Sequence, residues 1–162
     1  TNEAQKVDLL SNHGFAAGAN AICEAIINVV SDGSGSAVDA SIGLANGTHA
    51  TDADSITESL FVHLDANNAN INLESDDGTT EVDATDTTVD YTEGTPFEVW
   101  FDLRNPADIQ IYINGVLALG STVFKLDAAT GPLKQLVHVE KTSSTDTYEL
   151  DIEFMATRIA QQ

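Results

Sequence analysis

The sequence predicts an all-β domain built as a two-sheet antiparallel sandwich, and three features of its 162 residues support this fold class. Short segments with alternating apolar and polar residues recur along the chain, which is the pattern of strands that bury one face. Turn-forming residues separate these segments at short intervals. A chain of this length can also bury a core without disulfides, which agrees with its single cysteine, Cys23, in an apolar stretch.

The clearest strands lie between residues 97 and 119. Apolar residues alternate with polar or exposed-type residues along segments 97–104 and 109–113, so each segment predicts a strand with one buried face. Asn114-Gly115 follows directly and predicts a tight hairpin, because both residues accept a positive φ, with a returning strand at 116–119.

Alternation and turn signals predict the remaining organisation as one domain over residues 15–162, preceded by an arm or short helical turn at 1–14. Residues 15–30 also show helical spacing, but the β-branched cluster near the end favours a strand at 21–30. The acidic stretch 75–93 is expected to be largely exposed, with one strand near 80–84. Further strands are predicted at 38–44, 60–65, 70–74, 136–141 and 148–154.

The charge of the chain limits the partners that it can have. There are 26 acidic residues against 6 basic ones, which gives a formal net charge of -20. Nucleic acid and anionic membranes need clustered lysine and arginine, so neither is an expected partner. Such a surface predicts a soluble protein that resists nonspecific association.

Two segments carry a resemblance to a known fold family. The run DIQIYINGVLAL at 108–119 resembles the hairpin of concanavalin-like jelly rolls of the LamG and laminarinase type. The run YELDIEFMATRI at 148–159 resembles the last strand of these sandwiches. The wider layout from 94 to 154 is similar to jelly-roll proteins of tailed-phage virions, and the resemblance covers roughly residues 21–162.

This resemblance implies a structural role as the leading hypothesis. The chain would be a capsid decoration or cement protein on the virion surface, a homo-oligomer that adheres to the major capsid protein or other virion subunits without cofactor or catalysis. The alternative is a carbohydrate-binding or adhesin module, such as a tail-fibre piece. A glycoside hydrolase is a third and more remote possibility.

The glycoside hydrolase hypothesis depends on Glu149, Asp151 and Glu153. They resemble the E-x-D-x-E motif of laminarinase-like glycosidases, and alternation would place them on one face, with Phe154 in the core. In that family, however, the motif precedes the hairpin, whereas here it follows the hairpin. We therefore expect an exposed acidic strand face and no catalytic residues.

Calcium is the only cofactor that the sequence suggests, and its signal is weak. Among several pairs of hard-oxygen side chains, Asp76 and Asp77 before Gly78 are the foremost candidates, although they do not match an EF-hand loop. A solvated turn is the ordinary explanation of such pairs. The four histidines share no spacing typical of metal ligands, so each is expected to be a packed or surface side chain.

Trp100 and Tyr112 are the candidate binding residues. Both lie on the strand faces opposite the predicted core, and their strands are expected to adjoin. Such a pair could stack on a sugar or be buried against another subunit. The competing interpretation is that this face packs against a second layer of the domain.

Overall fold

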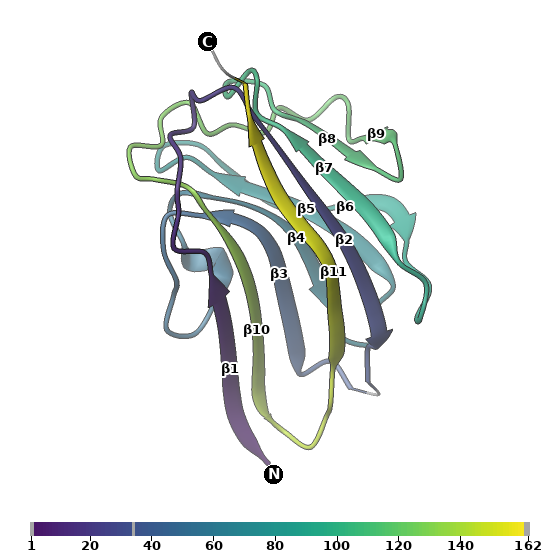
Figure 1. The fold of residues 1–162 in the computed structure, drawn as a ribbon. Coiled ribbons are helices and arrows are strands. Elements are labelled where there is room, and N and C mark those ends of the chain that lie inside the picture. Colours follow the sequence, from purple (N-terminus) through teal and green to yellow (C-terminus); the bar gives the residue numbers. More distant parts are fainter. Residues whose placement is uncertain (1, 34, 161–162) are drawn as a thin grey trace.

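The computed structural model describes residues 2–33 and 35–160 and shows a sandwich of two antiparallel sheets (Figure 1). No helix in these residues is long and apolar enough to cross a membrane. The elements in chain order are β1 (Glu3–Leu10), β2 (Ala21–Ser31), β3 (Val38–Ala45), the 3-10 helix η1 (Ala53–Ser55), β4 (Ser59–Asp65), β5 (Asn70–Asp76), β6 (Glu81–Asp90), β7 (Phe97–Asp102), β8 (Gln110–Ile113), β9 (Val116–Ala118), β10 (Lys134–Ser144) and β11 (Glu149–Ile159).

Each sheet combines strands that lie far apart in the sequence. The six-stranded sheet has the order β1-β10-β3-β4-β5-β6, and the five-stranded sheet has the order β11-β2-β7-β8-β9. The loop between β10 and β11 connects one sheet to the other (Figure 1). The predicted fold class, a two-sheet antiparallel jelly-roll sandwich, is confirmed.

The core lies between the inner faces of the sheets, as strand alternation predicts. On β7, Phe97, Val99 and Phe101 are buried, whereas Trp100 between them is 40% exposed on the outer face. Leu103 follows directly after this strand and is also buried. The alternation along 97–104 therefore predicted the correct inner face.

The cysteine is a buried hydrophobe, as predicted. Cys23 on β2 is 3% exposed, and its Sγ lies 3.2 Å from Oγ1 of Thr157 on β11. Burial raises the pKa of this thiol to about 11, so it stays protonated at neutral pH.

The predicted arm at residues 1–14 is wrong for most of its length. Residues Glu3–Leu10 form β1, which pairs with β10 at the edge of the six-stranded sheet. Val7 and Leu9 on this edge strand remain 58% and 64% exposed. A strand so little buried lacks the strong apolar alternation that reveals strands in a sequence.

Two other predictions need correction. The strand predicted near 80–84 is longer, because β6 spans Glu81–Asp90, although most of its side chains are exposed as expected. On β11, Leu150 and Ile152 pack against the core, but Phe154 does not. The pairing of β11 with β2 shifts register between Ile152 and Phe154, so Phe154 is 39% exposed and Met155 packs inward instead.

Candidate functional site

The outer face of the five-stranded sheet carries an aromatic pair. Trp100 on β7 is the direct cross-strand partner of Tyr112 on β8, and Tyr112 in turn faces Leu117 on β9. Trp100 and Leu117 are exposed and Tyr112 is half-buried. The three side chains thus form a short apolar row across three strands, and the exposure of Trp100 and Leu117 shows that no second layer of the described residues covers it.

A hollow of about 400 Å³ opens beside this pair. The hairpin turn at Asn114-Gly115 helps to shape it, and both turn residues have the positive φ values, 50° and 76°, that this dipeptide predicts. The side chains and backbone around the hollow come from Ile22, Trp100, Asp102, Arg104, Tyr112 and Gly115.

An ion pair supplies the polar groups of the hollow. Nε of Arg104 donates to Oδ1 and Oδ2 of Asp102 at 2.9 and 3.1 Å, and Nη2 of Arg104 donates to Oδ2. The hydrogen bonds from the Arg104 guanidinium hold the pKa of Asp102 below its ordinary value. At neutral pH the hollow therefore offers an ionised carboxylate, guanidinium N–H donors and two aromatic side chains.

The structure thus brings together the two predicted binding residues, Trp100 and Tyr112. Asp102 and Arg104 were not among the predicted binding residues. The sequence did contain a signal for both residues. They lie two and four positions after Trp100, and period-2 alternation therefore places them on the same strand face as Trp100.

The predicted calcium candidates have a structural role in the turn between β5 and β6. Oδ1 of Asp76 accepts a hydrogen bond from the Gly78 N–H at 2.7 Å. Oδ1 of Asp77, a buried residue, accepts from the N–H groups of Thr79 and Thr80 at 2.9 and 2.7 Å. These hydrogen bonds are those of a carboxylate-stabilised turn, and they lower the pKa of Asp77 against the opposing effect of burial.

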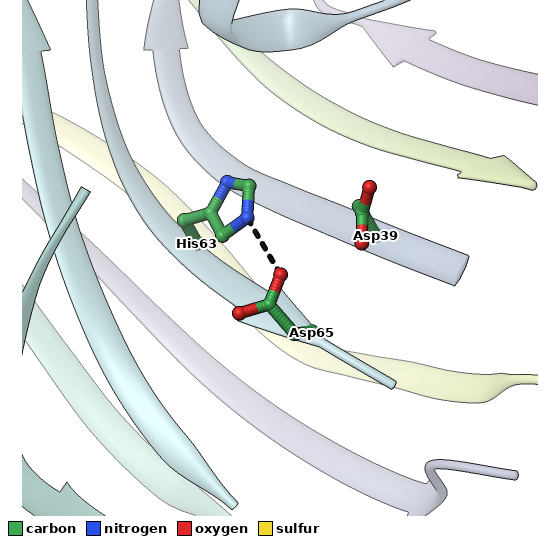
Figure 2. Close-up of side chains that lie close together, drawn as sticks. All are labelled: Asp39, His63 and Asp65. Carbon is green, nitrogen blue, oxygen red and sulfur yellow. Dashed lines mark hydrogen bonds and ion pairs between the residues drawn. The ribbon is translucent and has the colours of Figure 1, made fainter. Parts of the chain in front are cut away.

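The outer face of the six-stranded sheet carries a second polar assembly. In the register of the sheet, Asp8, His138, Ser41, His63, Asn72 and Asp86 follow one another across all six strands. Next to this row, Asp39 on β3 faces Asp65 on β4. Figure 2 shows Asp39, His63 and Asp65 close together, with Nε2 of His63 3.0 Å from Oδ1 of Asp65.

Burial and neighbouring carboxylates shift the pKa values of two residues in this assembly, His63 and Asp39. Burial would lower the pKa of His63, but the carboxylates of Glu74 and Asp65 raise it to about 9. Burial and the facing carboxylate of Asp65 raise the pKa of Asp39. This group was not predicted from the sequence, because His63 and Asp39 lie far apart in the chain and come together only through the register of β3 and β4.

Comparison with known proteins identifies the fold but no relative by sequence. No family model matches the chain, and no curated protein matches it. Among solved structures it resembles the potassium-bound carbohydrate recognition domain of Emp46p, with 12% identity and a TM-score of 0.62, covering 96% of this chain and 78% of that one. It also resembles the carbohydrate-binding module CBM66 from Bacillus subtilis, with 10% identity, a TM-score of 0.57, and coverage of 94% and 81%.

A third similar structure is the alginate lyase AlgAT5 from polysaccharide lyase family 7. It has 17% identity and a TM-score of 0.55 over 96% of this chain and 69% of that one. The chain therefore has a concanavalin-like jelly-roll fold, which it shares with the carbohydrate recognition domain, the carbohydrate-binding module and the lyase named above. At these identities the similarity establishes the fold alone.

Proposed function

We propose that the protein is a carbohydrate-binding module that acts by binding rather than by catalysis and holds a glycan over Trp100 and Tyr112. The observation that carries this proposal is the pairing of these two aromatic residues beside a hollow that contains Asp102 and Arg104. The fold, shared with a carbohydrate recognition domain and a carbohydrate-binding module, gives further support.

The chemistry of the hollow suits a sugar. The C–H groups of a pyranose ring pack against an aromatic face, and its hydroxyls both donate and accept hydrogen bonds. Asp102 is an acceptor and Arg104 a donor within the same hollow, so a ring stacked on Trp100 could use both. The overall charge of -20 favours neutral glycans over acidic ones.

The Trp100→Ala variant is expected to lose most of the glycan affinity. Screening the parent chain on a glycan array identifies a ligand, and calorimetry then compares the variants. Truncation of a central aromatic anchor should weaken binding at least about tenfold, equivalent to ~1.4 kcal/mol.

The matched control is Phe154→Ala, which removes another exposed aromatic ring from β11 and should leave the affinity unchanged. The proposal fails if the array detects no ligand, or if both variants bind as the parent does.

Adhesion to virion subunits of a tailed phage is a second candidate function. Its specific support is the edge strand β1, where Val7 and Leu9 are exposed and one side of the strand has no neighbour among the described strands. Another subunit could extend the sheet there and cover both side chains. In this candidate the chain lies on the capsid as a homo-oligomer bound to the major capsid protein.

Light scattering at seawater ionic strength tests the self-association that this second candidate includes. We expect the parent chain to form a closed oligomer and a Val7→Lys/Leu9→Lys double variant to be monomeric, since two charges on the edge oppose strand addition. If the parent chain is monomeric at high concentration, the exposed edge strand β1 no longer supports this second candidate function.

A further inference from the structure

Three side chains on the outer face of the six-stranded sheet converge on one point. Asp39 and Asp65 are direct cross-strand partners, and His63 lies two residues before Asp65 on the same face. One potential ligand atom from each of the three lies within 4.8 Å of the others. In Figure 2 the Nε2 edge of the His63 ring points toward the two aspartates.

The other nitrogen of the same ring, Nδ1, has two neighbours: Oγ of Ser41 lies 3.4 Å from it, and Glu74 also faces it. The carboxylate Oε2 of Glu74 lies 3.6 Å from Nδ1 of His63, and Glu74 on β5 is only 3% exposed. Neither carboxylate oxygen accepts a hydrogen bond from the described part of the chain, so a buried ionisable group is directed at the imidazole. In metal sites, a carboxylate on one ring nitrogen of a histidine orients the other nitrogen toward the ion.

We propose that Asp39, His63 and Asp65 bind one divalent transition-metal ion of the Zn²⁺ class, with Glu74 as the residue that orients His63. One imidazole nitrogen and two carboxylate oxygens are ligands that Zn²⁺ accepts. The ion would bind Nε2 in place of a proton, and that proton would be released to solvent. Asp65 is 40% exposed at its side chain, which leaves room for water as a further ligand.

The comparison with His138 shows what distinguishes this group. His138 also lies between two carboxylates, with Nδ1 2.7 Å from Asp8 and Nε2 3.3 Å from Glu140. There, Lys6 already pairs with Asp8 at 2.9 Å and supplies a positive charge. Among the described residues, no ion pair joins Asp39 or Asp65 to a lysine or arginine, so a metal ion would balance two facing carboxylates that share only His63.

This site is independent of the proposed glycan site. Asp39, His63 and Asp65 lie on the outer face of the six-stranded sheet, whereas Trp100 and Tyr112 lie on the outer face of the five-stranded sheet. Metal binding and glycan binding can therefore succeed or fail separately.

Titration of the full chain with ZnCl₂ tests the proposal. The chain is first stripped with a chelator, and calorimetry is run at ~0.15 M NaCl to screen nonspecific attraction to the acidic surface. We expect one saturable high-affinity site. Asp39→Asn should weaken it at least tenfold, and Glu74→Gln should weaken it by about 10–100-fold through the loss of histidine orientation.

The control removes one histidine and one aspartate elsewhere on the exposed surface, as His13→Gln/Asp151→Asn, and should retain the parent affinity. Circular dichroism checks that each variant is folded, and Co²⁺ absorption in the visible range reports the ligand set without relying on stability. If the parent shows no saturable site, or if Asp39→Asn and Glu74→Gln bind Zn²⁺ as the control does, the proposal is wrong.

Discussion

Replacement of Glu58 by alanine is expected to lower the free energy of unfolding by about 3 kcal/mol. Glu58 is 8% exposed and joins two loops. Its Oε1 accepts hydrogen bonds from the N–H and hydroxyl of Thr130 at 2.8 and 3.0 Å, and its Oε2 accepts from the Gly131 N–H and the Asn46 side chain at 2.9 and 3.0 Å. The alanine variant leaves all four donors without this partner, and buried unpaired donors are costly.

The same carboxylate predicts a pH dependence. The hydrogen bond from the Thr130 N–H is the largest cause that lowers the pKa of Glu58 below its ordinary 4.5, and the Gly131 N–H adds to it against the effect of burial. A carboxyl whose pKa is lower in the folded chain stabilises the fold above the unfolded pKa. This stabilisation is lost as the pH falls through the folded pKa.

Chemical denaturation of the parent, Glu58→Ala and Glu58→Gln at a series of pH values measures both effects. The stability difference between the parent and Glu58→Gln should be largest at neutral pH and should shrink below pH 4.5. Glu81→Ala is the control, because Glu81 is exposed at the start of β6 and such surface changes usually stay within about 0.5 kcal/mol. An equal loss in Glu58→Ala and Glu81→Ala would contradict this role of Glu58.

Replacement of Phe101 by alanine is expected to lower the free energy of unfolding by about 3–5 kcal/mol. Phe101 is 1% exposed and lies between the two sheets, where the lost ring leaves a cavity that close packing can only partly fill. Thermal or denaturant unfolding measures the change. The variant should unfold at a much lower denaturant concentration than the parent.

Phe154→Ala is the matched control for Phe101→Ala. Alternation along β11 would place Phe154 in the core, but the register shift after Ile152 turns it outward, where it is 39% exposed. It should cost distinctly less stability than Phe101→Ala. Equal losses in the two variants would mean that Phe154 belongs to the core and that the register of β11 is wrong.

The sequence predicted those strands whose signals, alternation and turn residues, lie within a few residues of one another. Strands β7, β8 and β9 were predictable because alternation and the Asn114-Gly115 turn act within a few residues. Strand β1 was not, since an edge strand with exposed side chains has little need of a buried face. The irregularity near Phe154 was also hidden, because a bulge changes the face of a side chain without changing the local sequence pattern.

The same distinction applies to the candidate sites. Trp100 and Tyr112 belong to neighbouring strands joined by a short turn, so their faces and their proximity follow from the sequence. Asp39 and His63 lie on strands separated by a longer connection that contains η1, and their contact depends on how β3 and β4 align. A connection of this length does not fix the register, whereas a two-residue hairpin does.

The central claim, that a glycan binds over Trp100, is tested most directly by the intrinsic fluorescence of this residue. Trp100 is the only tryptophan of the chain, so any change in tryptophan emission reports on this position alone. Titration with the glycan identified by the array should shift or quench the emission with the same dissociation constant that calorimetry gives. A glycan that binds with that affinity and leaves the emission unchanged would contradict the claim and place the binding site elsewhere.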